Sequence, residues 1–440
     1  MRRAPAHSRP PAAFLAGALL LFGQAACGTS GEATDGLDAD AVPRFELEEQ
    51  LRIGSLDDPE IGFSSIADVA LDRDGNVFVG ERSESRVRVY DASGLLVRTI
   101  GGAGGGPGEF QYISSFGVVG DTLWVYDSRA RRTTLFDREG TLLTTIVATG
   151  VAFPTPPEYG VSITIRPTGM REDGLFSSTY GMSLRAPPSR AGADTLRIPR
   201  LVFDATGAVV DTLGFLERPL PTLGSSSPIE RIKIGEREYP SPRPPSAEPL
   251  RSTLDDGQLI VDRALATSGD AGVFTVTRIG PWGDTLFQRH FRYRPRSYDE
   301  AIRDTLIAGM VGTYGGLASM VISSGGVVAI MEGAGASSPA DAEALERAYR
   351  DALVLPPLQP PVAQHRRGED GSYWLRREED AAGTFRWLVL NEDGSPRGEV
   401  RVPRRLSMYW TDGEQVWGAE RDEFDVPWLV KYRIVEAKRR

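Results

Sequence analysis

The chain has 440 residues, with 50 lysine and arginine residues against 60 aspartate and glutamate residues, which gives a net charge of −10. A chain this acidic is unsuited to bind nucleic acid, or to bind anionic lipid through its folded part. The single cysteine excludes an internal disulfide, so the fold must depend on a hydrophobic core. The length is sufficient for one large domain or for two smaller ones.

Residues 1–26 are predicted to be a signal peptide. Arg2 and Arg3 belong to a basic first region, and residues 12–26 form an apolar core of about 15 residues, shorter than the roughly 20 that a spanning helix needs. The segment ends at Ala25-Ala26-Cys27-Gly28, which resembles a bacterial lipobox. This resemblance implies that Cys27 is lipidated and becomes the mature N-terminus. The alternative is ordinary secretion with an incidental cysteine.

Residues 27–43 are polar, acidic and glycine-bearing, and we interpret them as a lipidated, flexible tether. Residues 44–436 are expected to form a single domain, followed by a charged tail at 437–440. Position 28 is glycine, so the aspartate retention signal of the inner membrane is absent, and by family resemblance we expect the outer membrane, facing the periplasm.

The clearest repeat covers residues 66–101, where four alternating strand patterns are separated by Asp-Gly and Ser-Gly turns. A second copy covers residues 116–146. The offset from Tyr90-Asp91 to Phe136-Asp137 is 46 residues, a spacing typical of propeller blades. Looser copies follow at 161–213, 250–292 and 364–402. The sequence therefore predicts an all-β propeller, most simply with six blades, although five or seven remain open.

The last copy, residues 406–436, contains only three strand patterns, whereas residues 44–53 form a lone strand near the start of the domain. We predict that 44–53 pairs with 428–436 and closes the ring, because closure leaves few exposed strand edges. Alternation would place Phe45, Leu47, Glu49 and Leu51 on one face. Trp124, Trp374 and Trp417 occupy equivalent second-strand positions, and we expect them in the core between blades.

Two insertions interrupt the repeats. Residues 217–249 are rich in proline and are predicted to be a loop. Residues 297–360 are predicted to contain a helix at 297–311, capped by Ser297 with Glu300, and a second at 340–353, with a hairpin formed by 317–321 and 327–331 between them. These helices would decorate the ring between blades four and five.

The segment Gly101-Gly-Ala-Gly-Gly-Gly-Pro-Gly-Glu-Phe110 is not a P-loop, because no Lys-Ser/Thr and no helix follow it. It resembles the linker of NHL-type propellers. Together with the closing pattern at 422–433, it makes the mature chain similar to six-bladed propeller lipoproteins of bacteria. That family has no common activity, so the resemblance implies a fold and a cellular location but no catalytic residue.

Catalytic groups are scarce. After removal of the signal peptide, only His290 and His365 remain, Asn76 and Asn391 lie in predicted turns, and no Gly-x-Ser-x-Gly motif occurs. We therefore expect no catalytic residue, no metal and no cofactor. The alternative is a propeller hydrolase of the gluconolactonase or arylesterase type with an axial metal site.

We favour a monomeric binding or scaffolding propeller, anchored by lipid, whose protein, peptide or small-molecule ligand the sequence does not identify. One face of a propeller carries the loops between second and third strands and the links between blades. Arginine and aromatic side chains there favour carboxylate recognition and interfaces, although 128–132 could instead be a solvated loop. The candidate binding residues on this face are Arg82, Glu84, Glu109, Phe110, Arg129, Arg131, Arg132, Tyr159, Asp422, Glu423 and Phe424.

Overall fold

The structure is a computed structural model. It describes residues 37–58, 60–147, 161–184, 195–219, 231–234, 237–242, 245, 247–254, 256–266, 269–315, 339–379, 384–424 and 426–437.

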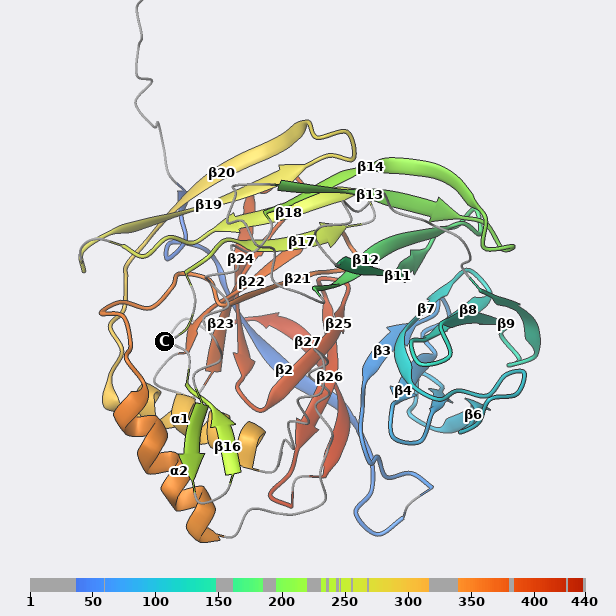
Figure 1. Cartoon of the computed structure of the whole chain (residues 1–440), viewed down its shortest axis with the longest axis horizontal. Helices are drawn as coiled ribbons and strands as arrows, with labels where there is room; N and C mark the ends of the chain where they lie inside the picture. Colours follow the sequence, from blue (N-terminus) through green and yellow to red (C-terminus); the bar gives the residue numbers. More distant parts are fainter. Residues whose placement is uncertain are drawn as a thin grey trace, which may run out of the picture. The chain divides into compact units, whose positions relative to one another are not determined.

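Six consecutive four-stranded antiparallel units fill most of the described chain, and we number them as blades one to six (Figure 1). Blade one consists of β3 (Asp68–Leu71), β4 (Val77–Glu81), β5 (Arg86–Tyr90) and β6 (Leu96–Gly101). Blade two consists of β7 (Ile113–Val119), β8 (Thr122–Asp127), β9 (Arg132–Phe136) and β10 (Leu142–Ile146). The turns contain glycine where φ is positive, as at Gly75 (+82°) and Gly94 (+89°), which is why Asp-Gly and Ser-Gly marked them in the sequence.

Blade three consists of β11 (Val161–Met170), β12 (Phe176–Leu184), β13 (Thr195–Phe203) and β14 (Val209–Pro219). Blade four consists of β17 (Leu250–Leu254), β18 (Gly257–Asp262), β19 (Gly272–Ile279) and β20 (Thr285–Tyr293). The short β1 (Leu37–Asp38) pairs in parallel with β20 and adds a fifth strand to blade four. This strand lies within residues 27–43, the stretch that the sequence led us to interpret as a tether.

Blade five consists of β21 (Gln364–Arg367), β22 (Tyr373–Glu379), β23 (Thr384–Leu390) and β24 (Pro396–Pro403). Blade six consists of β25 (Leu406–Thr411), β26 (Gln415–Arg421), β27 (Pro427–Glu436) and, from the other end of the domain, β2 (Arg44–Ile53). The predicted closure is confirmed: β2 runs antiparallel to β27, from Phe45 opposite Glu436 to Ile53 opposite Leu429.

The strand β2 also pairs in parallel with β24 of blade five over Arg44–Glu46, so blades five and six share one eight-stranded sheet. In Figure 1, the blue β2 lies among the red strands of these two blades. This second pairing was not predicted. Through this pairing, β2 covers part of the outer edge of blade five, and through its pairing with β27 it completes blade six.

The predicted facing of β2 is wrong beyond Glu49. The pairing with β27 shifts between Glu49 and Leu51, which leaves Gln50 as the extra residue of a β-bulge. Phe45 and Leu47 therefore pack in the cluster between blades five and six, whereas Leu51 packs in the cluster between blades six and one. One inserted residue reverses every side chain that follows it.

Buried clusters connect the blades in order. They join blades one and two, two and three, four and five, five and six, and six and one. Between blades three and four, the guanidinium of Arg200 donates to the carbonyl of Leu254. Trp124, Trp374 and Trp417 are 4%, 0% and 1% exposed and belong to three of these clusters, as predicted.

The inserted elements differ in detail from the prediction. Within 217–249, β15 (Arg231–Ile234) and β16 (Arg237–Pro240) form a hairpin. Helix α1 (Glu300–Gly315) begins after Asp299, whose carboxylate accepts the Ile302 N–H at 2.8 Å. Asp299 is therefore the cap, and the predicted cap Ser297 instead forms a backbone bridge to Leu358.

Helix α2 (Pro339–Ala352) packs against α1 through a small core that contains Ile307, Leu345 and Tyr349. The predicted hairpin at 317–321 and 327–331 lies outside the described residues. Of the helices described, neither has the length and apolar character needed to cross a membrane.

Candidate functional site

Two arginines and a tyrosine gather where the second-to-third-strand loops of blades one and two meet the linker between these blades. The Arg82 guanidinium carbon lies 5.1 Å from the centre of the Tyr112 ring, and that of Arg129 lies 6.0 Å from it. Both arginines are exposed, and Tyr112 is 36% exposed. The Arg82 Nε also donates to the Ile113 carbonyl at 3.3 Å, which fixes the side chain beside the ring. We call these three residues the Arg–Tyr–Arg cluster.

The glycine-rich linker that carries Tyr112 is held in place by two side chains, that of Arg132 in β9 and that of Glu109 in the linker itself. Arg132 donates to the carbonyls of Gly106 (2.8 Å) and Glu109 (2.7 Å), and the Glu109 carboxylate accepts the Gly106 N–H at 2.7 Å. Phe110 is 0% exposed and packs against Phe136, so it does not belong to a binding surface. Three predicted binding residues thus stabilise the linker instead of pointing toward a ligand.

The remaining predicted residues are placed as follows. Arg131 is exposed with φ of +54°, and Glu84 accepts a hydrogen bond from Ser64 at 3.2 Å. In blade six, the Asp422 carboxylate accepts from Phe424 N, Val426 N and Trp428 Nε1, so it organises its own turn. Glu423 and Phe424 are exposed on that turn, Phe424 by 67%. Tyr159 and Cys27 lie outside the described residues.

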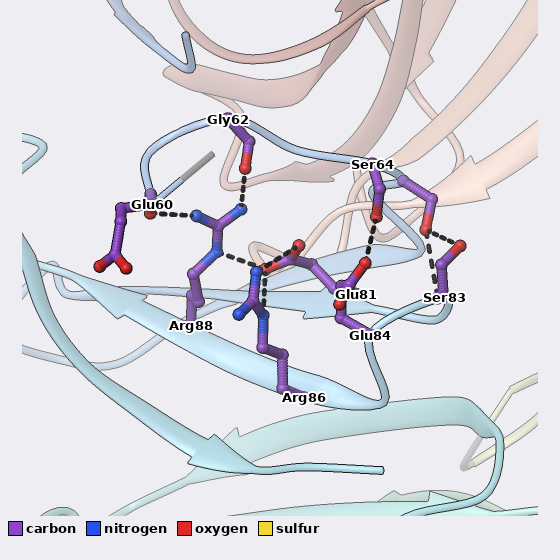
Figure 2. A network of polar contacts seen from close by, with 9 residues as sticks. Glu60, Gly62, Ser64, Glu81, Ser83, Glu84, Arg86 and Arg88 are labelled. Atoms are coloured by element: carbon purple, nitrogen blue, oxygen red, sulfur yellow. Dashed lines mark hydrogen bonds and ion pairs between the residues drawn. The ribbon is translucent and has the colours of Figure 1, made fainter. Parts of the chain in front are cut away.

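Figure 2 shows the polar network that supports the first of these loops. The Arg88 guanidinium binds the Glu81 carboxylate and donates to the carbonyls of Glu60 (2.8 Å) and Gly62 (2.7 Å), while its carbon lies 4.2 Å from the centre of the Phe63 ring. Arg86 adds a weaker contact to Glu81 at 3.3 Å. Because Arg88 and Glu81 are both almost fully buried, the network makes the base of the loop rigid.

A buried charge recurs near the C-terminal end of the second strand in four of the blades. The position is occupied by Glu81 in blade one, Asp127 in blade two, Arg377 in blade five and Glu420 in blade six, each at most 2% exposed. Each charge has partners: Asp127, for example, accepts from the N–H groups of Gln111, Arg129 and Ala130. The ends of these strands are therefore fixed platforms for the adjacent loops.

The first strands of three blades bring another group together. The Tyr409 hydroxyl of β25 donates to the Ile66 carbonyl at 2.9 Å, and Arg366 of β21 donates to the Tyr409 carbonyl. Burial raises the pKa of Asp68, and the nearby Arg366 and Arg82 act against this rise. Burial, with Asp68 next in effect, also raises the pKa of Tyr409, and Arg366, Arg421 and Arg82 lower it. Arg82 thus belongs electrostatically to both the Arg–Tyr–Arg cluster and this inner group.

The two histidines lie apart from each other in chain and environment. His290 of β20 is exposed, and its Nδ1 lies 3.0 Å from the Thr275 hydroxyl. His365 of β21 is partly buried, and burial together with Arg263 lowers its pKa. Within the part of the chain that the structure describes, no group of three or more histidine, cysteine, aspartate or glutamate residues is arranged to hold a metal ion.

Sequence reasoning missed Tyr112, Asp68 and Arg366. Tyr112 could have been found, because it follows Phe110 by two residues in the same linker and is flanked by the arginine-bearing loops. The proximity of Asp68 to Arg366 could not have been found, because the two residues are almost 300 residues apart in an irregular set of repeats.

Comparison with known proteins agrees with this architecture. Residues 58–148, which span blades one and two, match the DUF5128 family model, described as a 6-bladed beta-propeller. No curated protein matches the sequence. Similar solved structures include a protein of Bacteroides fragilis described as exported, with 10% identity, a TM-score of 0.41 and coverage of 90% of this chain and 99% of that one.

A member of the DUF4221 family from Bacteroides vulgatus has 11% identity and a TM-score of 0.43, with coverage of 89% and 99%. Virginiamycin B lyase of Staphylococcus aureus has 12% identity and a TM-score of 0.36, with coverage of 89% and 100%. At such identities and TM-scores, no residue role is transferred from these proteins. The chain is an all-β, six-bladed β-propeller closed by its N-terminal strand, and its first two blades match a propeller family model.

Proposed function

We propose that this protein is an envelope lipoprotein that acts as a binding propeller and uses the Arg–Tyr–Arg cluster to recognise carboxylate-bearing ligands such as acidic peptide segments. The observation that carries this proposal is the placement of the Arg82 and Arg129 guanidinium carbons 5.1 Å and 6.0 Å from the centre of the exposed Tyr112 ring. Arginine presents a planar fork of donors that fits a carboxylate, and an adjacent aromatic ring keeps that fork oriented.

The rigidity of the surrounding loops supports this role. The carboxylates of Glu81 and Asp127 fix the ends of the strands from which the Arg82 and Arg129 loops emerge, and Arg132 fixes the linker that carries Tyr112. A preorganised site loses less conformational entropy when it binds a ligand than a mobile one does. The three side chains are therefore suited to binding without rearrangement of the backbone.

The binding proposal can be tested with a peptide panel that differs only in charge. We expect saturable binding of acidic peptides, measured by calorimetry, and a loss of about tenfold in affinity in the Arg82→Ala/Arg129→Ala double variant, since hydrogen bonds to charged groups contribute about 1.5–3 kcal/mol. The control Arg171→Ala/Arg433→Ala removes the same charge from exposed arginines elsewhere. Equal losses in both variants, or no binding by the wild type, would contradict the proposal.

The lipid anchor and the location at the outer membrane are a separate proposal, which rests on the sequence. Cys27 follows the apolar core of the signal peptide, and a diacylated, N-acylated cysteine would anchor the protein firmly, because each buried methylene contributes about 0.8 kcal/mol. We expect the mature protein to incorporate labelled palmitate and to fractionate with the outer membrane. The Cys27→Ala variant should be unlabelled and soluble, and an unlabelled wild type would refute the anchor.

A further inference from the structure

A cavity of about 520 Å³ lies where the outer strands of blades four and five meet the first described residues of the chain. Its walls come from β1 and the start of β2, from the end of β20 and the residues that follow it, and from β23 and β24. The lining residues are Asp38, Asp40, Arg44, Asp270, Arg292, Tyr293, Arg294, Arg296, Arg386, Glu399 and Arg401. Drug-sized and cofactor-sized ligands occupy cavities in this volume range.

The lining is positively charged within an otherwise acidic protein. It holds six arginines against four carboxylates. Two of these carboxylates are already bound: Glu399 accepts from Arg386 at 2.8 Å, and Asp40 accepts from Arg377 at 2.8 Å and from Arg386 at 3.0 Å. The lining therefore carries more guanidinium groups than carboxylates, and its other two carboxylates are those of Asp38 and Asp270.

The arginines are placed by strand periodicity. Arg292, Arg294 and Arg296 alternate with Tyr293 and Pro295, and an extended chain places such residues on one side. Another part of the lining contains Arg386 of β23 and Arg401 of β24, which pair with each other in the antiparallel register. Glu399 and Asp40 bind Arg386, and Arg401 brings a second guanidinium group next to it in the lining.

At one wall of the cavity, arginines bind a carboxylate of the protein itself in the way that we expect them to bind a ligand oxyanion. The Asp40 carboxylate accepts from three donors: the Arg377 guanidinium, the Arg386 guanidinium and, at 2.9 Å, the backbone N–H of Arg294. Arg377 is itself buried and lies over the Tyr293 ring, with 6.0 Å between its guanidinium carbon and the ring centre. The protein's own carboxylate thus occupies one oxyanion position, and the row Arg292, Arg294 and Arg296 lies beside it.

We propose that this cavity binds a phosphate-bearing ligand through the row Arg292, Arg294 and Arg296 together with Arg401. A phosphate group fits this lining better than a second carboxylate, because it offers more acceptor oxygens and up to two negative charges to several guanidinium forks. Soluble phosphate esters and phospholipid headgroups carry the same group, so the chemistry is common to both sources.

The test measures binding of inorganic pyrophosphate and glucose 6-phosphate by calorimetry. We expect saturable binding by the wild-type chain and a loss of at least about tenfold in affinity in Arg292→Gln/Arg294→Gln, since two charge-assisted contacts are removed. The matched control Arg171→Gln/Arg433→Gln should stay within about twofold of the wild type, because these exposed arginines are outside the cavity. Circular dichroism and melting of both variants verify that they fold.

The second arm separates the two sources. Phosphatidylcholine vesicles with and without phosphatidylglycerol are sedimented with chains that all carry Cys27→Ala, so that no acyl group contributes. Sedimentation with phosphatidylglycerol vesicles that requires Arg292 and Arg294 assigns the phosphate to a lipid headgroup, and binding of glucose 6-phosphate alone assigns it to a soluble ester. The proposal is refuted if no probe binds, or if the control pair weakens binding as much as the cavity pair. Arg82 and Arg129 stay intact throughout, so this outcome is independent of the Arg–Tyr–Arg cluster.

Discussion

Blades one and two differ from blades five and six in where their buried charges find partners. In blade one, Glu81 is bound by Arg88, seven residues further along the same blade. In blade two, Asp127 is bound by backbone N–H groups of neighbouring loops. In blades five and six, the equivalent Arg377 and Glu420 take partners from the N-terminal segment: Asp40 for Arg377 and Arg52 for Glu420, which is 368 residues away from Arg52.

The two distant pairs have opposite polarity. Blade five presents a buried cation to a carboxylate of the N-terminal segment, and blade six presents a buried carboxylate to its arginine. A segment shifted along these blades would separate Arg377 from Asp40 and Glu420 from Arg52, and the loss of such a partner is costly for a buried charge. The early blades thus use local pairs for rigidity, whereas the late blades use distant pairs to select the position of the closing segment.

The largest test of this difference is truncation. Deleting residues 28–53 removes β2 with its pairing to β24 and β27, and it also removes Asp40, which binds Arg377, and Arg52, which is one of the partners of Glu420. We therefore expect unfolding or aggregation at room temperature. Deleting 28–36 alone removes none of these contacts and should leave the melting temperature unchanged. Differential scanning calorimetry compares the two, and equal melting of both proteins would disprove the closing role of β2.

The local pair of blade one should show the largest effect of a single substitution. Arg88→Met leaves Glu81 fully buried with only the longer Arg86 contact, so we expect a loss of about 3–5 kcal/mol in the free energy of unfolding. The control Arg86→Met removes a contact from a side chain that is 30% exposed and should cost less than about 1 kcal/mol. Urea denaturation measures both, and a similar cost for the two would show that burial does not decide the effect.

The ion pair between Arg377 of blade five and Asp40 can be tested through the pH dependence of stability. Burial of Asp40 opposes its ionisation, but Arg377 and the hydrogen bonds from Arg294, Arg377 and Arg386 lower the pKa to about 2 from 3.8. The resulting stabilisation, at most about 2 kcal/mol, is complete above pH 3.8 and is lost as the pH falls through 2. Asp40→Asn should remove that part of the acid-denaturation curve. A variant whose stability falls as steeply with pH as the wild type would argue against an ionic partner for Arg377.

The ion pair between Glu420 of blade six and Arg52 should lose the least stability when one partner is replaced. Glu420 also accepts from the Tyr432 hydroxyl at 2.7 Å and from Arg405 at 3.0 Å, and Arg52 is 31% exposed. We therefore expect Arg52→Met to cost about 1 kcal/mol, less than Arg88→Met. Thermal unfolding of the two variants side by side provides the ranking, and a larger loss for Arg52→Met would reverse our view of which pair matters more.

The sequence was sufficient to predict what local patterns encode. The turns at Asp72–Gly75 and Asp91–Gly94, the repeated second-strand tryptophans and the missing last strand led to the propeller and to its closure. The reversal of β2 after Glu49 was not predictable by counting, because a bulge depends on how its partner strand fits it. The partners of Arg377 and Glu420 were also out of reach, since nothing near either residue in the chain marks its counter-charge.

The candidate site shows the same division. The sequence pointed to arginines and aromatic residues in the loops of blades one and two, but it did not separate Arg129, which lies near the Tyr112 ring, from Arg132, which binds linker carbonyls. That separation depends on backbone direction within a few residues. The alternating Arg292, Arg294 and Arg296 were visible in the sequence, and only the fold shows that a cavity lies beside them.

The closing strand β2 also has a consequence for the order of events during synthesis. It is among the first folded segments to be made, yet Glu48 reaches its partner Arg433 only 385 residues later. Until β27 exists, the edge of β2 that pairs with it has no partner, and every chain that stops short of the last blade carries an incomplete sheet. Such long-range pairing slows folding, because a large loop must be ordered before the contact forms. The ring is thus completed only by a full-length chain, and truncated products remain open to proteases.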